Sequence, residues 1–465
     1  MTDTNNRIGK DFSLLSLAYF GLPAFLMNTF TQLFRSLDDG LFISRYVGES
    51  ALGSVNLINP ISGIQFALAC LFSVGASNIS ARLMGQNKQQ EAKQVFTRVA
   101  ISGCIAGAIF GLLVNFFDIP ILRALGADES NLEFAITQVR IIYILSPLMI
   151  FNQIASSYFS TAGKPKMGLI CSITSGVINI SLDVVLVAIL KMGVVGAAIA
   201  TAAGEIAVFL ISFLFFINKK QEIHFVQPAG HIIETSIEAA EFSLPQSINS
   251  ISFALTAWLS NIVIIQYIGQ VGVSANAIVQ DIRKILTAGL IGFATCICPI
   301  LSYNYGSKNV KRLKKILKYL VCLGVAVSII LVVIGLLLRV PLINIFMNEN
   351  SSQQYYDLTY LALTIELFEV GFIAGCVTIS RSLIALSLPK EATVVSIFRN
   401  IIIKVIVYIG LPYIMGDLGI WYSQPVSEGI AFIFGVIMVI NVLPKTLKKL
   451  EQDDEISENK NAYIE

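Results

Sequence analysis

The sequence predicts an all-α integral membrane protein with twelve transmembrane helices. Of its 465 residues, 55% are hydrophobic and only 13% are charged, whereas soluble globular domains carry about 25% charged residues. Apolar runs of about 20 residues, long enough to cross a bilayer, recur along the whole chain. A β-barrel would instead show segments of about 10 residues with alternating polarity. We expect two six-helix lobes related by a pseudo-two-fold axis along the membrane normal.

The apolar runs define the spans and, between them, the domains. The spans are expected at 13–37, 51–80, 94–117, 134–160, 167–190, 193–217, 239–264, 272–302, 315–338, 355–382, 392–414 and 418–444. This order predicts an N-terminal lobe at 1–217, a cytoplasmic linker at 218–238, a C-terminal lobe at 239–447 and a disordered cytoplasmic tail at 448–465. The tail is highly charged and poor in large apolar residues, which is typical of disorder. Lys and Arg gather in alternate loops, and such loops stay cytoplasmic, so both termini are expected on the cytoplasmic side.

The two halves of the sequence resemble each other at a nearly constant offset. Pro23 in YFGLPAFLMNTF corresponds to Pro245 in EFSLPQSINSIS, 222 residues later. GQNKQQEAKQV from Gly85 corresponds to GSKNVKRLKKI from Gly306 at an offset of 221. Six spans per copy is an even number, so both copies have the same orientation in the membrane. Channels and membrane enzymes can also carry duplications, but repeats around polar groups at mid-membrane are the usual construction of secondary transporters.

The acidic residues inside the spans differ between the two copies. Asn179 and Asp183 lie four residues apart in SGVINISLD and therefore share a helix face. An acid near the middle of a bilayer costs roughly 2.5 to 3.5 kcal/mol, which favours a functional role. Asp39, at the end of the first span, has the non-ionisable Asn261 as its counterpart, and the counterpart of Asp183 is apolar. A coupling ion is therefore expected in the N-terminal half.

Together with Thr201 of the sixth span, these residues supply two carboxylates, an amide oxygen and a hydroxyl. Such hard ligands suit a small cation such as Na⁺. Two buried carboxylates also raise each other's pKa, which favours proton uptake instead. The sequence does not decide whether H⁺ or Na⁺ binds at Asp39, Asn179, Asp183 and Thr201. A third interpretation is that Asn179 and Asp183 only form structural hydrogen bonds between helices. Asp38 cannot face the same direction as its neighbour Asp39, and we prefer Asp39 as the coupling acid.

Other polar and aromatic residues inside the spans are candidates for a substrate cavity. Glu205 and Glu428 occupy matched positions at an offset of 223 and are either cavity acids or structural partners of other polar groups. Met149, Phe151 and Tyr158 are candidates for an adaptable apolar pocket. A structural ion-pair network is expected among the charged residues of the tenth and eleventh spans, Glu366, Glu369, Arg381, Arg399 and Lys404.

Several classes of function are disfavoured by the sequence. A net charge of +2 argues against a nucleic-acid partner. The chain has no GxxxxGK[ST], HExxH or GxSxG motif, so neither an ATP-driven nor a hydrolytic mechanism is indicated. We expect no enzymatic activity and no cofactor besides the coupling ion.

Three segments resemble the multidrug and toxic compound extrusion (MATE) family, most closely its bacterial DinF or MepA type. They are LDDGLFISRYVG from Leu37, the GKPK turn at Gly163 followed by INISLD, and GVVGAAIATAAGE from Gly193. The chain departs from the family at Gly40 and Ser44, where Thr and Gly are common.

The resemblance implies a V-shaped pair of lobes that exports cationic amphiphiles in exchange for H⁺ or Na⁺. The family's N-lobe cation site falls on Asp39, Asn179, Asp183 and Thr201. We expect a monomer in the cytoplasmic membrane, in contact with membrane lipid. A flippase or exporter of a lipid-linked precursor is the alternative.

Overall fold

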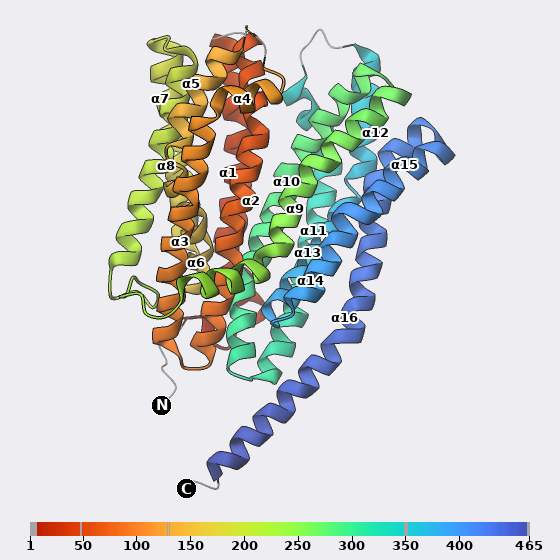
Figure 1. The fold of residues 1–465 in the computed structure, drawn as a ribbon. Coiled ribbons are helices and arrows are strands. Elements are labelled where there is room, and N and C mark those ends of the chain that lie inside the picture. Colours follow the sequence, from red (N-terminus) through yellow and green to blue (C-terminus); the bar gives the residue numbers. More distant parts are fainter. Residues whose placement is uncertain (1–6, 47–48, 128, 130, 348–351, 463–465) are drawn as a thin grey trace. The chain divides into compact units, whose positions relative to one another are not determined.

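The computed structural model describes residues 7–46, 49–127, 129, 131–347 and 352–462, without the side chains of 35–53, 55–57, 251, 253, 254 and 453–462. Within these residues every regular element is a helix (Figure 1). The first half contains η1 (Arg7–Gly9), α1 (Leu14–Tyr46), α2 (Glu49–Gly85), α3 (Gln89–Phe116), α4 (Asp118–Ala124), α5 (Leu132–Tyr143), α6 (Ser146–Thr161), α7 (Lys166–Asp183), η2 (Val184–Ile189) and α8 (Gly193–Ile217). The second half contains α9 (Ile232–Tyr267), α10 (Gln270–Gly306), α11 (Val310–Phe346), α12 (Gln353–Glu366), α13 (Glu369–Ala385), α14 (Pro389–Ile397), η3 (Phe398–Ile402), α15 (Ile403–Met415) and α16 (Asp417–Ala462).

The described helices confirm the predicted membrane class. Ten of them are long and apolar enough to cross a membrane, and the number rises to twelve when two bent pairs are each counted as one span. The pairs are α5 with α6, bent by 57°, and α12 with α13, bent by 42°. They are the fourth and tenth predicted spans, which hold matched positions in the two copies. Pro147 lies in the first turn of α6, where its missing N–H suits a helix start rather than a helix interior.

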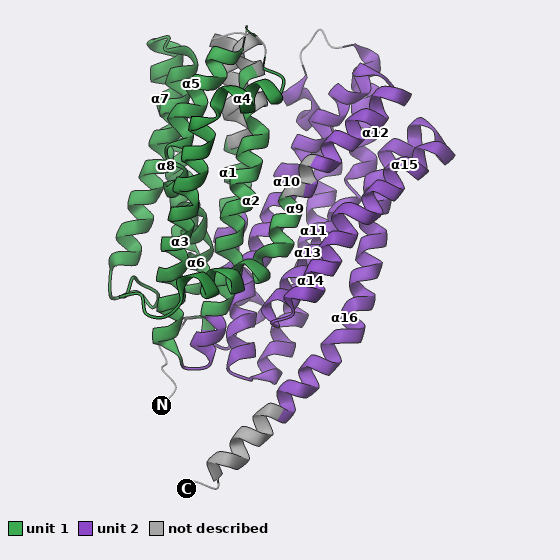
Figure 2. Ribbon diagram, in the orientation of Figure 1, with its two compact units in different colours: residues 1–8, 26–80, 88–250 green, residues 9–25, 81–87, 251–465 purple. Residues whose placement is uncertain are grey.

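The helices form two compact units, which Figure 2 shows in different colours. Unit 1 contains residues 1–8, 26–80 and 88–250, and unit 2 contains residues 9–25, 81–87 and 251–465. The first part of α1 therefore belongs to unit 2, and the first part of α9 belongs to unit 1. Each unit contains the start of a helix whose remainder lies in the other unit. The lobe boundaries predicted at 217 and 239 follow the chain and do not anticipate this exchange.

Matched contacts hold the exchanged segments within each unit. In unit 1, the backbone N–H of Gly75 donates to Ser243 Oγ at 2.7 Å, and Ser247 Oγ donates to the carbonyl of Ala67 at 3.1 Å. In unit 2, the repeat-related positions also meet. Cys296 Sγ lies 3.8 Å from the carbonyl oxygen of Phe20, and a Cβ added at Gly289 would lie 2.6 Å from the Phe25 ring.

The predicted linker is shorter than expected and is fixed to unit 1. Helix α9 begins at Ile232 rather than at 239. The backbone N–H of Phe225 donates to the carbonyl of Phe216 at 3.0 Å, and the N–H of Val226 donates to Thr97 Oγ1 at 3.1 Å. The Phe225 ring lies 4.9 Å from that of Phe96. The linker thus covers the start of α3.

The tail differs from the disordered segment that composition predicts for 448–465. Helix α16 continues to Ala462 (Figure 1), because TLKKLEQ from Thr446 consists largely of strong helix formers. An ion pair between Lys314 Nζ and Glu451 Oε1, at 2.9 Å, joins this extension to α11. Net charge and low hydrophobicity predicted disorder, but helix propensity and this contact favour the helix.

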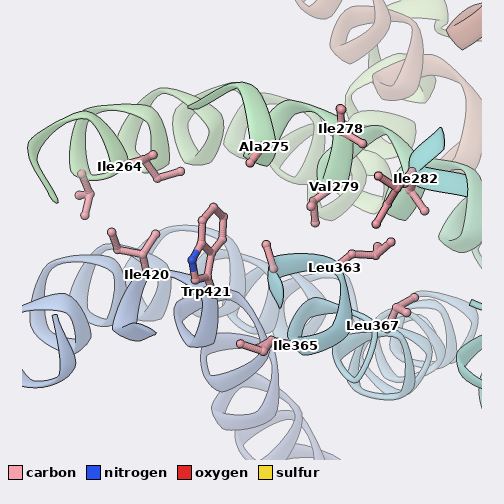
Figure 3. Packing of buried hydrophobic residues seen from close by; sticks show 13 residues of the cluster. Ile264, Ala275, Ile278, Val279, Ile282, Leu363, Ile365, Leu367, Ile420 and Trp421 are labelled. Carbon is pink, nitrogen blue, oxygen red and sulfur yellow. The ribbon is translucent and has the colours of Figure 1, made fainter. Parts of the chain in front are cut away.

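Unit 2 has a large apolar core around Trp421 of α16. Trp421 is 1% exposed and packs with Ile264 of α9, Ala275 of α10 and Leu363 of α12 (Figure 3). Burying so large a side chain stabilises the unit strongly. This cluster fixes α16 against α10, and both helices contribute charged residues to the interior.

Candidate functional site

Two of the four predicted cation-site residues, Asn179 and Asp183 of α7, lie in the interior of unit 1, and a third, Thr201 of α8, is half-buried. Asp183 is 2% exposed and Asn179 is 8% exposed. Asn179 Nδ2 donates to Thr201 Oγ1 at 3.3 Å. The helices approach closely because Gly204 of α8 has no side chain: a Cβ there would lie 3.0 Å from Ser175 Oγ. This hydrogen bond joins α7 to α8, and cation binding by these residues stays a prediction.

Asp183 is the last residue of α7, and the π-helical segment η2 follows it directly. π-Helical turns are rare and occur frequently at functional sites. Leu186 of η2 packs against Gly196, where a Cβ would lie 3.0 Å from the leucine side chain. The π-helical segment η2 thus begins directly after the buried Asp183 and continues beside the start of α8.

A regular ladder of contacts aligns α1 with α7 within unit 1. A Cβ added at Gly168 would lie 2.6 Å from Met27 Sδ, Thr31 Oγ1 is 2.7 Å from Ser172 Oγ, and a Cβ at Gly176 would overlap the Phe34 ring. These pairs keep an offset of 141 to 142 residues, so the two helices run parallel.

Extended by one turn, the ladder brings positions 38 and 39 of α1 level with Asn179 of α7. The side chains of Asp38 and Asp39 lie outside the described residues, so the choice between them stays a prediction.

Glu205, one of the matched glutamates, takes part in a hydrogen bond between α6 and α8. Asn152 Nδ2 donates to Glu205 Oε2 at 2.7 Å and to the Glu205 carbonyl at 3.0 Å. Asn152 Oδ1 is buried and accepts no hydrogen bond from the described part of the chain. Of the two interpretations that the sequence left open for Glu205, this contact favours the structural partner.

The three predicted pocket residues of unit 1 lie mainly in its packed interior. Tyr158 is fully buried, with its hydroxyl 2.9 Å from Ser80 Oγ. Phe151 is 2% exposed, and its ring lies 5.3 Å from that of Phe209. Gln65 Nε2 lies 3.3 Å from Met149 Sδ, which is part-buried. Packing accounts for Phe151 and Tyr158 in this conformation, and a cavity role for the three stays a prediction.

Glu428, the second matched glutamate, has a strongly charged environment in unit 2. It is 1% exposed. Arg399 Nε lies 2.7 Å from its Oε2, and Lys404 Nζ lies 3.4 Å from its Oε1. These ion pairs differ from the predicted network of the tenth and eleventh spans, because Arg399 and Lys404 pair with Glu428 of the twelfth span. The two matched glutamates differ in their partners, a neutral amide in one copy and two cations in the other.

A further ion pair of unit 2 lies at the bend between α12 and α13. Arg283 Nη1 of α10 lies 3.1 Å from Glu369 Oε1 at the start of α13, where the helix dipole favours an acid. Glu366, the last residue of α12, is 5% exposed, and its Oε2 has no hydrogen-bond partner within the residues that the structure describes.

Gln424 joins the Arg283–Glu369 ion pair to the ion pairs of Glu428. With its carbonyl toward the cations, it accepts from Arg283 Nη1 at 2.6 Å and from Lys404 Nζ at 3.2 Å, while its amide donates to Tyr408 at 2.9 Å. Gln424, Tyr408 and Asn152 are not recognisable as site residues from the sequence. Their only sign in the sequence is a polar side chain within an apolar span. Many polar residues in such spans have no special role.

The described chain is thus a duplicated bundle of membrane helices with two polar interiors. Unit 1 has a small oxygen-rich cluster around Asp183, and unit 2 has a network of buried ion pairs. This combination is typical of polytopic membrane proteins that move solutes.

Comparison with known proteins gives the same result. The MatE family model matches residues 23–185 and 245–409, one segment in each copy, so the chain belongs to the MatE family. The multidrug export protein MepA of Staphylococcus saprophyticus is 23% identical over 430 residues, which cover 91% of this chain and 92% of MepA. The probable multidrug resistance protein YoeA of Bacillus subtilis is 22% identical over 435 residues, which cover 90% of this chain and 91% of YoeA.

Solved structures share the fold. A crystal structure of MATE in complex with MaL6 matches with a TM-score of 0.88 at 21% identity, over 97% of this chain and 100% of that one. An outward-facing MATE family transporter of the MOP superfamily matches with a TM-score of 0.84 at 21% identity, over 97% and 99% of the two chains. The predicted family and fold class are confirmed.

Proposed function

We propose that this protein is a cation-coupled antiporter that exports amphiphilic cations from the cell. The observation that carries the proposal is the cluster on α7 and α8, where Asp183 is 2% exposed and Asn179 donates to Thr201. Family membership supports it, as do the names of MepA and YoeA as multidrug export or resistance proteins. Both termini are expected in the cytoplasm and the protein in the cytoplasmic membrane, as a monomer.

The residues of the cluster fit either coupling ion. The Thr201 hydroxyl accepts from the Asn179 amide nitrogen, which leaves the amide oxygen available beside a carboxylate. Oxygen ligands of this kind suit Na⁺. A carboxylate can also bind a proton, so H⁺ is the alternative occupant at Asp183. Asp39 is the proposed second carboxylate.

Coupling requires that the ion and the exported cation stabilise different conformations of the protein. A ligand that binds two conformations with equal affinity does not shift the equilibrium between them. Neutralising Asp183 changes the charge at the junction of α7 with η2. We propose that this change alters helix packing in unit 1 and favours release of the cation outside.

A lipid-linked precursor flippase is less well supported. Its pyrophosphate substrate would need cationic side chains that are not already neutralised. The buried cations Arg283, Arg399 and Lys404 of unit 2 each pair with a glutamate.

The test is efflux of a fluorescent cationic dye from proteoliposomes, with a pH gradient or a Na⁺ gradient imposed separately. We expect one gradient to drive efflux by the wild type, and Asp183→Asn to lose it because the amide can neither bind a proton nor supply a charge. Asp281→Asn is the control, since Asp281 pairs locally with Lys284 on α10. Undiminished gradient-driven efflux by Asp183→Asn would contradict the proposal.

A further inference from the structure

Unit 2 carries a concentration of basic residues at the turn from α10 into α11. Six lie within eleven positions: Lys308, Lys311, Arg312, Lys314, Lys315 and Lys318. Three of them contact residues outside this turn. Lys314 pairs with Glu451 at 2.9 Å and Lys315 with Asp11 at 2.8 Å, and Arg312 Nη1 donates to the carbonyl of Gly9 at 3.1 Å.

Lys311 and Lys318 are exposed and have no polar or ionic partner among the described residues. They lie three residues before and four residues after Lys314, on one face of α11. The same face continues with Val321, Val325 and Ile329, which are more than half exposed, as expected of side chains that face lipid. The two lysines therefore lie where the lipid-facing stripe reaches the end of the span.

Helix α16 shows the same transition. Its stripe of Ile433, Ile437 and Ile440 is exposed, and helical spacing continues it to the exposed Lys448. Lys448 lies one turn before Glu451, which binds Lys314 of α11. Three exposed lysines thus lie within about one helical turn of the ion pair between Lys314 and Glu451. We call these three residues, Lys311, Lys318 and Lys448, the lysine corner.

The duplication provides an internal comparison, because the first copy has no such corner. At an offset of 221, Gln90 corresponds to Lys311 and Thr97 to Lys318. Thr97 is 4% exposed, and its hydroxyl accepts from Val226 of the linker at 3.1 Å. In the first copy the chain's own linker covers the Thr97 end of this face, and the exposed Gln90 is uncharged. In the second copy the chain continues along α16 instead, and the corresponding face of α11 stays exposed and positively charged.

We propose that the lysine corner binds the phosphate headgroup of an anionic phospholipid, with the acyl chains along the apolar stripes of α11 and α16. Clustered lysines next to a transmembrane helix attract anionic lipids, and each strengthens binding by about fivefold. The lysines supply positive charge at the level of the headgroups, and the isoleucines and valines contact the acyl chains. The inference does not depend on which ion or solute is transported.

The test is lipid binding by the full-length protein in detergent, followed by native mass spectrometry with dioleoylphosphatidylglycerol and dioleoylphosphatidylcholine. The variant Lys311→Gln, Lys318→Thr, Lys448→Gln gives α11 the residues of the first copy. The control Lys219→Gln, Lys220→Gln, Lys390→Gln removes the same charge from exposed positions elsewhere. Size-exclusion profiles and unfolding midpoints establish that both variants fold.

We expect the wild type and the control to retain phosphatidylglycerol in preference to phosphatidylcholine. The lysine-corner variant should lose on the order of a hundredfold in affinity for phosphatidylglycerol, from three lysines at about fivefold each. Equal loss in both variants, or no preference in the wild type, would overturn the proposal. Displacement of the lipid by millimolar glycerol 3-phosphate would also overturn it, because the corner would then be a site for soluble phosphates.

Discussion

At the scale of single residues, repeat-related positions have acquired different chemistry. Glu205 and Glu428 hold matched positions in the sixth and twelfth spans, yet Glu205 accepts from the neutral Asn152 and Glu428 binds Arg399 and Lys404. Their matched positions are readable from the sequence. Their partners are not, because those come from helices whose proximity no pattern within one span encodes.

This difference predicts unequal effects of the same substitution. Glu428→Gln leaves two buried cations without a counter-charge, and removing one partner of a buried pair costs about 3 to 5 kcal/mol. Glu205→Gln keeps an oxygen that can accept from Asn152, so its cost should stay near 1 kcal/mol. Unfolding in mixed micelles titrated with sodium dodecyl sulfate measures both. Equal costs would show that Glu428 does not stabilise unit 2 through its charge.

At the scale of helices, the clearest matched contact joins the ends of α2 and α10 within unit 2. A Cβ added at Gly85 would overlap the carbonyl oxygen of Tyr303, and one added at Gly306 would overlap that of Arg82. Both pairs are related by an offset of 221, so the contact is reciprocal. The backbones of α2 and α10 are in direct contact here, so movement of side chains could do little to relieve a clash with an added Cβ.

We therefore predict that Gly85→Ala and Gly306→Ala each destabilise the protein by about 1 to 3 kcal/mol, the usual cost of overpacking. Gly63→Ala on α2 is the control, because nothing lies within 4 Å of its added Cβ. Alanine there should be neutral or stabilising by up to about 1 kcal/mol, from helix propensity. The same unfolding titration measures all three, and a neutral Gly85→Ala would refute the reciprocal contact.

Helices also show how far sequence alone could predict this structure. Hydrophobic runs predicted the membrane class, and twelve spans agree with the structure once the two bent pairs are counted as single spans. The apolar runs are continuous through both bends, so they predict single spans. Pro147 is a sequence signal for the first bend, but the run through Leu367 and Phe368 carries no such signal for the second. In the candidate site, helical spacing predicted the shared face of Asn179 and Asp183, and the resemblance to the family pointed to Thr201. The π-helical segment after Asp183 gives no signal in composition.

At the scale of the whole molecule, the chain boundary between the halves is not the boundary between the compact units. Residues 9–25 belong to unit 2, where Phe25 lies over Gly289 and the Phe20 carbonyl meets Cys296. A fragment containing only the second half would leave this face of α10 uncovered. The half-molecule that the duplication suggests is therefore incomplete as a folding unit.

This exchange predicts the behaviour of split chains. Cutting after Ala229, in an exposed part of the linker, gives fragments 1–229 and 230–465. Fragment 230–465 alone should aggregate or be degraded, since it lacks the helix start that packs on α10. Co-expression with 1–229 should restore a monodisperse complex, because both exchanged segments are then present. Fluorescence-detected size exclusion distinguishes the cases. A monodisperse 230–465 with the unfolding midpoint of the intact protein would mean that the exchanged segments contribute little, and that the second copy folds as an independent lobe.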